Sequence, residues 1–230
     1  MILGSRDPGR GAAAIDSLRR EQPAWAERVD TLTLDVSDDA SVAAAREVLG
    51  GQYGAGTPLY ALVNNAGIGL GSADMAQVLA VNTLGVQRVC ETFIPLVETG
   101  GRVVNVSSAS GPNFVNQCSA HRQAFFQDDS LAWSDIAGFM AKVIDRQHDA
   151  NALEAMGLGA ASPYGLSKAL VNLYTMQLAR RFPGLVINAC TPGYIETDLT
   201  RPSAEARGLT PAELGMKAPE HGARVILFLL

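Results

Sequence analysis

The chain alternates short apolar runs with longer segments of helical periodicity, and this alternation limits the folds that it can adopt. The apolar runs predict strands at residues 28–36, 58–67, 101–108 and 184–190. The periodic segments predict helices at residues 10–20, 38–49 with Ser37 as the cap, 75–98, 163–181 and 221–230. Because the strands are apolar throughout and helices separate them, the sequence predicts an α/β fold with a doubly wound parallel sheet covered on both faces.

The composition fits one folded domain over residues 1–230. Apolar residues make up 47% of the chain and charged residues 18%, a balance typical of globular proteins. The net charge is −5 without long runs of like charge, which argues against nucleic acid or an anionic membrane as a partner. Cys90, Cys118 and Cys190 lack C-x-x-C spacing, so we expect no metal site, no disulfide framework, and a location in the reducing cytoplasm.

Small, polar or glycine-rich residues follow the carboxyl end of each predicted strand. In a doubly wound, Rossmann-type sheet, ligands bind beyond these ends. Such residues allow a ligand to approach the backbone closely. The residues at the four ends are Asp35, Asn64 to Gly67, Ser107 with Ser108, and Thr191 to Gly193. We therefore expect a ligand site at this edge of the sheet.

Tyr164 and Lys168 are four residues apart on a predicted helix that Pro163 begins. Residues at this spacing lie on the same helical face. At about 4 Å and an effective dielectric near 20, an ammonium stabilises a phenolate by roughly 4 kcal/mol, which moves a phenol pKa from about 10 toward 7. A group with such a pKa suits general acid–base catalysis. The same spacing also arises by chance on amphipathic helices. The choice between a catalytic pair and a chance spacing therefore depends on the other residues of the chain.

Six segments together resemble the short-chain dehydrogenase/reductase family. They follow the family's order along nearly the whole chain: LDVSD (34–38), NNAG (64–67), VNTLG (81–85), VVNVSS (103–108), YGLSK (164–168) and TPGYIETD (191–198). Each segment alone is a weak signal, but six in register are a strong one. The resemblance implies hydride transfer between a nicotinamide dinucleotide and a small-molecule carbonyl or alcohol, and it favours chemistry over chance for Tyr164 and Lys168.

The resemblance assigns catalytic roles to four residues. Tyr164 would donate a proton to the nascent alkoxide in reduction, or accept one in oxidation. Lys168 would lower the pKa of Tyr164 and hydrogen-bond the nicotinamide ribose. Ser108, rather than Ser107, would hold the substrate oxygen. Asn82 would keep a water in line with Lys168, and the alternative is a polar residue that kinks or bridges a helix.

The resemblance also implies cofactor contacts at three strand ends. They are Asp35 and Val36 for the adenine edge, Asn64, Ala66 and Gly67 for the adenosine ribose and nearby backbone, and Pro192, Gly193, Ile195 and Thr197 for the nicotinamide amide and pyrophosphate. Alternatively, Thr197 and Asp198 cap a short helix. Arg6 has the charge and planar shape that suit a 2′-phosphate, which favours NADP(H). Asp7, which can instead pair with Arg10, keeps NAD(H) as the less favoured alternative.

The stretch between Ser108 and Tyr164 is much longer than most members of the family need. The sequence predicts that residues 112–160 are an inserted helical segment. Its clearest helix places Ile136, Phe139, Met140, Val143 and Ile144 on one face, with Ser134 as the cap. Such an insertion resembles the monomeric carbonyl reductases, which implies a monomer. Phe125, Phe126 and Trp133 either line a substrate pocket or pack the inserted helix onto the domain.

Some parts of the family pattern have no counterpart in the chain: the first strand, its T-G-x-x-x-G-x-G turn, the first helix and the last strand. In the strand order 3-2-1-4-5-6, loss of the first strand separates the strand at Leu34 from the strand at Val63. Each unpaired buried backbone group costs about 1–3 kcal/mol, against a domain stability of roughly 5–15 kcal/mol. We therefore expect an incomplete sheet, in which residues 1–230 are a truncated domain that binds NADP(H) poorly.

The function that the sequence favours is NADP(H)-dependent reduction of a ketone, aldehyde or quinone to an alcohol, with Tyr164 as the proton donor. One alternative is an inactive truncated remnant that acts as a binding or regulatory module, although Asn82, Ser108, Tyr164 and Lys168 are all present. Another is an enzyme that acts on nucleotide-sugars through the same tyrosine and lysine. No motif indicates the substrate or the physiological direction.

Overall fold

The computed structural model describes residues 1–54, 56, 58–69 and 74–230. Its strands are β1 (Ile2–Ser5), β2 (Asp30–Thr33), β3 (Leu59–Asn64), β4 (Val97–Val106) and β5 (Val186–Cys190). The helices between and after them include α1 (Pro8–Glu21), α2 (Pro23–Ala26), α3 (Asp39–Tyr53), α4 (Met75–Leu79), α5 (Gly85–Phe93), α10 (Pro163–Arg181) and α12 (Pro219–Leu229). All of these strand pairs are parallel, which confirms the predicted α/β class.

Parallel pairing divides the strands into two sheets. β1 pairs with β2 along its whole length. β3, β4 and β5 form the second sheet in that order. Among the described residues, no ladder joins β1 to β3. β2, which ends next to Leu34, and β3, which contains Val63, thus belong to different sheets, and the incompleteness of the sheet stays a prediction.

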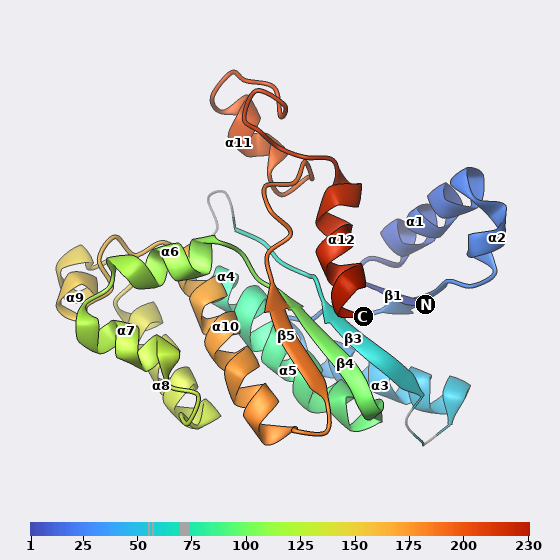
Figure 1. Ribbon diagram of the computed structural model, residues 1–230, viewed down its shortest axis with the longest axis horizontal. Helices are drawn as coiled ribbons and strands as arrows, with labels where there is room; N and C mark the ends of the chain where they lie inside the picture. Colours follow the sequence, from blue (N-terminus) through green and yellow to red (C-terminus); the bar gives the residue numbers. More distant parts are fainter. Residues whose placement is uncertain (55, 57, 70–73) are drawn as a thin grey trace.

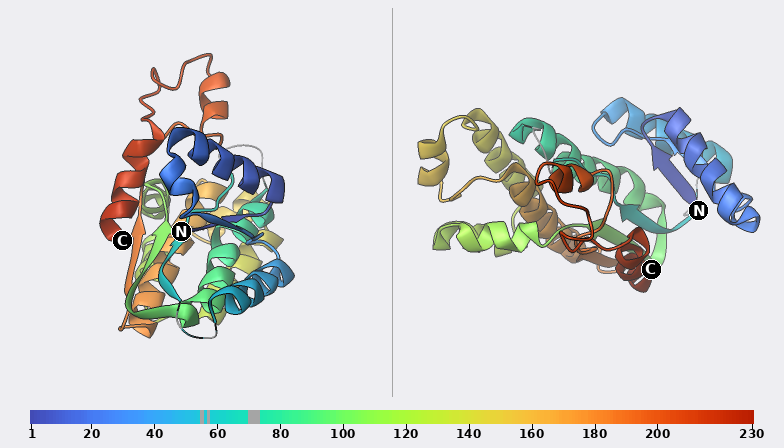
Figure 2. Two further views of the ribbon diagram at one scale, coloured as in Figure 1. Left: turned by 90° about the vertical axis from the view of Figure 1, so that its right-hand side faces the viewer. Right: turned by 90° about the horizontal axis from the view of Figure 1, so that it is seen from above.

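Helices cover the three-stranded sheet on both faces (Figure 1). On one face, α5 and α10 bury Val103 of β4 among Cys90, Tyr174 and Leu178. On the other face, α12 contacts β4 and β5 (Figure 2). The two-stranded sheet packs against α1 and, through β2, against α3. These layers match the doubly wound arrangement predicted from the sequence.

Helix α5 connects the two sheets. Its Val89 and Phe93 lie in one buried cluster with Leu32 of β2. At the first residue of α5, a Cβ on Gly85 would stand 2.9 Å from Val36 Cγ2 and 3.1 Å from Val36 O. The end of the two-stranded sheet therefore approaches α5 more closely than a side chain at residue 85 would allow.

The helix predicted for residues 75–98 is confirmed from Met75 to Phe93, but its π-helical turn was not predicted and its end at residue 98 is wrong. After α4 the chain forms a π-helical turn (Ala80–Leu84), then α5 and a short 3₁₀ turn (Ile94–Leu96), and Val97 begins β4. Pro95 lacks a backbone N–H and does not fit the interior of an α-helix. The apolar residues on both sides of it suit a helix or a buried strand equally well, so their pattern does not mark the boundary.

Two predicted helix caps are also wrong. Helix α3 is capped by Asp38, whose carboxylate accepts a hydrogen bond from Ala40 N at 3.0 Å, and not by Ser37. Helix α8 (Trp133–Asp145) already contains Ser134 in its first turn. Serine and aspartate are equally good caps, so the residue type alone does not choose between neighbouring positions.

The predicted insertion, residues 112–160, is helical along most of its length. Its helices are α6 (Ser110–Gln117), α7 (Ala120–Gln127), α8 and α9 (Ala150–Ala155), where the sequence indicated one helix. The Phe125 ring centre lies 4.8 Å from that of Phe139, and Trp133 lies 5.1 Å from Tyr174 of α10. Phe126 is buried in the same cluster as Phe125. These aromatic side chains pack the inserted helices onto the domain, as the packing alternative proposes, and a pocket-lining role stays a prediction.

Candidate active site

Helix α10 begins beside the end of β4 because its first turn is fixed there. Ser162 Oγ accepts a hydrogen bond from Gly165 N at 3.1 Å, and Pro163 occupies the first helical position, where no N–H is needed. Helix α6 packs closely on α10, where a Cβ on Gly111 would stand 2.9 Å from the carbonyl carbon of Lys168. This close packing sets the position of the turns that carry the predicted catalytic residues.

Tyr164 and Lys168 lie on the same face of α10, as their spacing predicts. Lys168 Nζ is 5.6 Å from the centre of the Tyr164 ring. Lys168 is 5% exposed, and its ammonium donates a hydrogen bond to Val106 O at 2.8 Å. Burial lowers the pKa of Lys168 to about 8, so most of the population carries a positive charge at neutral pH.

Burial raises the pKa of the Tyr164 phenol, and hydrogen bonding with the Ser108 hydroxyl opposes that rise. The lowering of this pKa toward 7, expected from the sequence, is therefore wrong for this structure. The value near 7 assumes an ammonium about 4 Å from a hydrated phenolate. Burial removes this hydration, and its loss favours the neutral phenol. At neutral pH Tyr164 keeps its proton and can act as a donor.

The two serines after β4 have different surroundings. Ser107 is 5% exposed, and its hydroxyl donates to Lys168 O at 3.3 Å. Ser108 is half-buried, and its hydroxyl lies near the Tyr164 phenol and 3.3 Å from Ser110 Oγ. Ser107 is thus part of the protein framework, whereas Ser108 presents its hydroxyl beside the phenol. This difference supports the choice of Ser108 as the substrate-binding serine.

Asn82 is fully buried in the π-helical turn between α4 and α5. Its Nδ2 donates to Ile68 O at 2.9 Å and to Ser167 Oγ at 3.0 Å, and its Oδ1 accepts from Ile68 N at 2.9 Å. The side chain therefore bridges α10 and the segment after β3, as the alternative for Asn82 proposed. A Cβ on Gly67 would stand 3.4 Å from Asn82 Oδ1 and 3.8 Å from Lys168 Nζ. The water relay through Asn82 stays a prediction.

A buried polar network, which the sequence analysis missed, lies next to these residues. Asn105 Oδ1 accepts from Asn64 Nδ2 at 2.8 Å, and Asn105 Nδ2 donates to Thr175 Oγ1 at 2.8 Å. Asn64 Nδ2 also contacts Cys90 Sγ at 3.2 Å. The side chain of Asn64, predicted to face the cofactor ribose, therefore joins β3 to β4 and α5. A signal was available, because a polar residue inside the apolar run VVNV needs a partner when it is buried.

Asp35 and Val36, the predicted adenine contacts, follow β2 of the smaller sheet. The Asp35 carboxylate accepts hydrogen bonds from Ser37 N at 2.9 Å and from Ser37 Oγ at 2.6 Å, and these bonds lower its pKa. Val36 O accepts a hydrogen bond from Arg88 Nη1 of α5 at 2.7 Å. The two residues predicted to meet the adenine thus form a local turn that Arg88 ties to α5.

Arg6 lies exposed in the turn between β1 and α1, and it makes no ion pair within the described part of the chain. Asp7 caps α1, because its carboxylate accepts a hydrogen bond from Arg10 N at 3.0 Å. This bond is the main cause of the lowered pKa of Asp7. Asp7 therefore caps the helix through the backbone of Arg10, and the role of Arg6 as a phosphate ligand stays a prediction.

The remaining predicted cofactor contacts lie after β3 and β5. Ala66 and Gly193 are exposed, Gly67 and Pro192 are half-buried, and Ile195 is buried. Gly193 has a φ of +90°, and no atom lies within 4 Å of the position where its Cβ would stand. Ile195 pairs with Lys217 in an isolated parallel bridge, which anchors the segment after β5.

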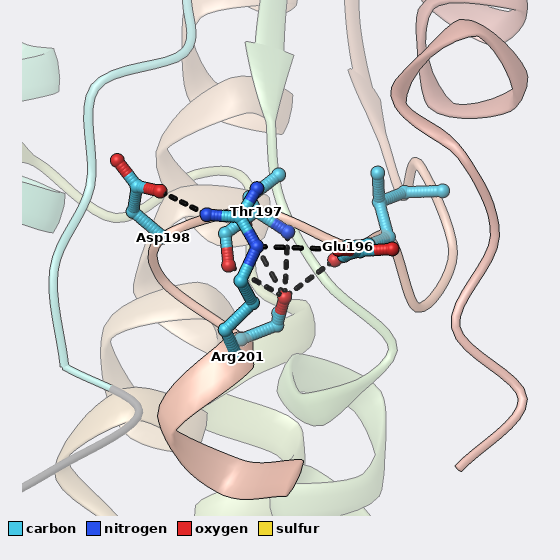
Figure 3. Close-up of polar contacts among 6 residues, drawn as sticks. Glu196, Thr197, Asp198 and Arg201 are labelled. Carbon is cyan, nitrogen blue, oxygen red and sulfur yellow. Dashed lines mark hydrogen bonds and ion pairs between the residues drawn. The ribbon is translucent and has the colours of Figure 1, made fainter. Parts of the chain in front are cut away.

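The alternative that Thr197 and Asp198 cap a short helix is wrong, because Thr200 is the N-cap of the helix that follows. Helix α11 (Arg201–Glu205) begins after Thr200. The amides of Thr200 and Arg201 donate to the backbone carbonyl of Thr197 at 3.0 and 2.9 Å. Arg201 also pairs with Asp198 (Figure 3). Thr200 and Arg201 were not predicted from the sequence, and both hold the turn that carries Thr197.

Two features are absent from the part of the chain that the structure describes. Within residues 1–54, 56, 58–69 and 74–230, no group of three or more His, Cys, Asp or Glu side chains is arranged to hold a metal ion. No helix in this part of the chain has the length and apolar character needed to cross a membrane. The three cysteines are free and buried. The polar side chains gathered where the three-stranded sheet ends thus carry a phenol, an ammonium, hydroxyls and amides.

Comparisons with known proteins agree with this arrangement. A family model described as short chain dehydrogenase matches residues 1–122. Carbonyl reductase (NADPH) 1 of Bos taurus is 31% identical over 244 residues, which cover 100% of this chain and 80% of the relative. Menthone neomenthol reductase from Mentha piperita has a TM-score of 0.70 and 28% identity, covering 82% of this chain and 79% of that one. Salutaridine reductase from Papaver somniferum, at 23% identity, shares the fold with a TM-score of 0.79 over 100% of this chain and 86% of that one. The chain therefore belongs to the short-chain dehydrogenase/reductase family of oxidoreductases.

Proposed function

We propose that this chain uses NADPH to reduce the carbonyl group of a small ketone, aldehyde or quinone to an alcohol. The proposal depends on one observation, the gathering of Tyr164, Lys168 and Ser108 where β4 ends and α10 begins. Lys168 Nζ lies 5.6 Å from the centre of the Tyr164 ring, and the Ser108 hydroxyl lies beside the phenol. The bovine relative, whose name states both carbonyl reductase and NADPH, supports this reaction and this cofactor.

The residues around the site fit a nicotinamide dinucleotide. Gly193 borders open space where a side chain would stand, and Gly67 keeps free a position between Asn82 Oδ1 and Lys168 Nζ. The residues that would hold the nicotinamide end are Pro192, Gly193, Ile195 and Thr197, and those for the adenosine end are Arg6, Asp35 and Val36. Arg6 would bind the 2′-phosphate through its planar guanidinium, which favours NADP(H) over NAD(H).

The site residues divide the remaining work of the reaction, in which NADPH supplies the hydride. Ser108 donates a hydrogen bond to the substrate oxygen and stabilises the negative charge that develops there. Tyr164, which burial keeps protonated, gives its proton to the nascent alkoxide. Lys168 stays cationic and stabilises the resulting phenolate. Its ammonium has three donors, one of which binds Val106 O, so others are available to the ribose hydroxyls.

The full-length protein tests the proposal, with NADPH and a simple quinone or aromatic ketone as substrates. We expect Tyr164→Phe to lower kcat by about 10²–10⁴-fold and to change the Kd for NADPH by less than about twofold. Tyr60→Phe is the matched control, because Tyr60 is 51% exposed and its hydroxyl donates to Leu230 O at 2.8 Å. Unchanged activity in Tyr164→Phe removes Tyr164 from the mechanism.

The same assays separate the alternatives. A wild-type protein that binds NADPH without any turnover favours the inactive binding or regulatory module. Weak NADPH binding by residues 1–230 alone, expected from the unpaired gap between the two sheets, stays a prediction. Stoichiometric tight binding by that chain, seen as a blue shift and gain in nicotinamide fluorescence, contradicts it.

We also propose that the protein is a monomer, because the inserted segment covers part of α10. Gln177 Nε2 donates a hydrogen bond to Leu131 O at 2.7 Å, and Arg180 pairs with Asp129 at 3.3 Å. These contacts occupy a helical face that another chain would otherwise be able to use. Sedimentation equilibrium should give the mass of one chain, and the mass of a dimer contradicts the proposal.

A further inference from the structure

The turn that carries Thr197 is supported from within by Thr200, which is 7% exposed. The Thr200 hydroxyl oxygen lies 2.6 Å from Ile195 O and 3.1 Å from Thr197 O. Both carbonyl oxygens can only accept, so the single hydrogen of the Thr200 hydroxyl is directed toward them. The same oxygen accepts a hydrogen bond from Thr197 N at 2.9 Å.

This arrangement fixes the direction in which the Thr197 hydroxyl donates. Thr197 Oγ1 lies 3.3 Å from Thr200 Oγ1. Because the only hydrogen of the Thr200 hydroxyl is already used, Thr197 must be the donor in this contact. The Thr197 hydroxyl then offers a ligand its lone pairs and not its hydrogen.

Arg201 supports the same turn from outside. Its guanidinium pairs with Glu196, with Nε 3.2 Å from Oε1, and with Asp198, so it contacts the residues on both sides of Thr197 (Figure 3). The Arg201 side chain is 46% exposed, so water and salt screen both ion pairs. The buried hydroxyl of Thr200 is therefore the principal support for Thr197.

We propose that Thr200 is a positioning residue that makes Thr197 an acceptor for the N–H groups of a primary carboxamide. A Thr197 hydroxyl that only accepts selects the amide of nicotinamide over a carboxylate in the same place. A carboxylate has no hydrogen to donate, and its lone pairs would repel those of Thr197. The inference rests on the proposed NADP(H) function, in which Thr197 lies at the nicotinamide end.

The test compares the affinities of the full-length protein for three ligands, measured by calorimetry. They are NADP⁺, nicotinic acid adenine dinucleotide phosphate, in which a carboxylate replaces the amide, and 2′,5′-ADP, which lacks the nicotinamide end. Wild type should prefer NADP⁺ over the acid analogue by at least about tenfold, the effect of one good hydrogen bond.

Thr200→Val keeps the side-chain shape but lets the Thr197 hydroxyl rotate and donate. The preference for NADP⁺ should then fall about tenfold, while the affinity for 2′,5′-ADP stays at the wild-type value. Thr200→Ser keeps the hydroxyl and should restore the preference. Thr210→Val is the matched control, because Thr210 is an exposed threonine whose hydroxyl bonds Glu213 Oε2 at 2.8 Å.

Each outcome decides a different question. A Thr200→Val protein that keeps the wild-type preference overturns the inference and leaves the proposed function standing, since NADP⁺ still binds. Equal losses for all three ligands, or a variant that does not fold, assign Thr200 a purely structural role and also overturn the inference. A wild-type protein that binds no NADP⁺ and reduces no carbonyl contradicts the proposed function itself.

Discussion

The two sheets of the molecule hold their functional residues in different ways. At the end of the three-stranded sheet, Lys168 and Asn105 are buried and bonded to groups far away in the sequence. At the end of the two-stranded sheet, Arg6 is exposed, and Asp35 bonds to Ser37, two residues away. Tertiary structure fixes the first region, whereas local turns shape the second.

This difference corresponds to the work proposed for each region. Proton transfer needs groups held at fixed distances and shielded from water. Recognition of a phosphate by a guanidinium depends on charge and on a forked shape, and it can take place at the surface. We therefore expect substitutions in the three-stranded region to change stability and chemistry, and those in the two-stranded region to change mainly the choice of cofactor.

The largest effect on stability is expected from Asn105→Leu. Leucine leaves Asn64 without its oxygen acceptor and Thr175 without its donor. Each of the two buried polar groups left without a partner costs about 1–3 kcal/mol, so the free energy of unfolding should fall by about 2–6 kcal/mol in urea denaturation. Arg6→Ala, in the other region, should leave the urea midpoint unchanged. Equal shifts for the two variants contradict the distinction between the regions.

Lys168→Met should stabilise the protein at neutral pH while it removes activity. Burial lowers the pKa of Lys168 from 10.5 to about 8, so between these values the unfolded state binds more protons, and wild-type stability rises with pH. Below about pH 8, burial of the ammonium lowers the free energy of unfolding of the wild type by roughly 3 kcal/mol. The variant avoids this cost but loses the hydrogen bond to Val106 O, so its net gain is smaller. Thermal unfolding should show that the variant is more stable than the wild type at pH 6 but not at pH 11. A stability difference that does not change with pH contradicts this account.

The same titration should appear in catalysis. The pH dependence of kcat/KM reports groups of the free enzyme. Because the ammonium of Lys168 is the form that stabilises the phenolate, wild-type kcat/KM should fall as pH rises through about 8. A plateau that extends to pH 10 shows that the charge of Lys168 is not needed.

Local features of both regions could be predicted from the sequence. Helix α10 spans Pro163–Arg181, as predicted, because Pro163 suits the first helical position and no further proline interrupts the segment before Pro183. The shared face of Tyr164 and Lys168 follows from helical geometry alone. The strand ends also lie where apolar runs meet small polar residues, since burial and turn chemistry act within a few residues.

Long-range partners could not be predicted in this way. Thr175 bonds Asn105, and Ser167 bonds Asn82, across distances in the chain that periodicity does not encode. The direction of the Tyr164 pKa shift depends on how far the surrounding helices exclude water, which a spacing of four residues does not reveal. The π-helical turn and the polarity of Thr197 likewise depend on contacts between separate segments.

Arg6→Glu should change the cofactor preference and little else. It removes charge-assisted hydrogen bonds to a 2′-phosphate, so the affinity for NADPH should fall about tenfold to hundredfold, with NADH binding unchanged or improved. The value of kcat at saturating cofactor should stay the same. Arg10→Glu is the control for net charge, because Arg10 is exposed in the first turn of α1. Equal losses in both variants assign the effect to general charge rather than to Arg6.

The smallest effect concerns the connection between the two regions. Arg88 of α5 donates to Val36 O at 2.7 Å and pairs with Asp39 at the start of α3. Arg88→Met keeps the aliphatic stem but removes both contacts, so the residues after β2 lose a direct bond to α5. The affinities for NADPH and 2′,5′-ADP should fall about threefold to tenfold, with kcat at saturating NADPH unchanged.

Arg46→Met provides the matched control for Arg88→Met. Arg46 also connects α3 to α5, because its Nη1 donates to Thr92 O at 3.0 Å, but it does not bond the residues after β2. Its substitution should leave both affinities at the wild-type value. If the two variants weaken binding equally, the packing of α3 on α5 as a whole positions the adenosine side. If Arg88→Met lowers kcat as well, the two regions are not held independently, and the comparison between them fails.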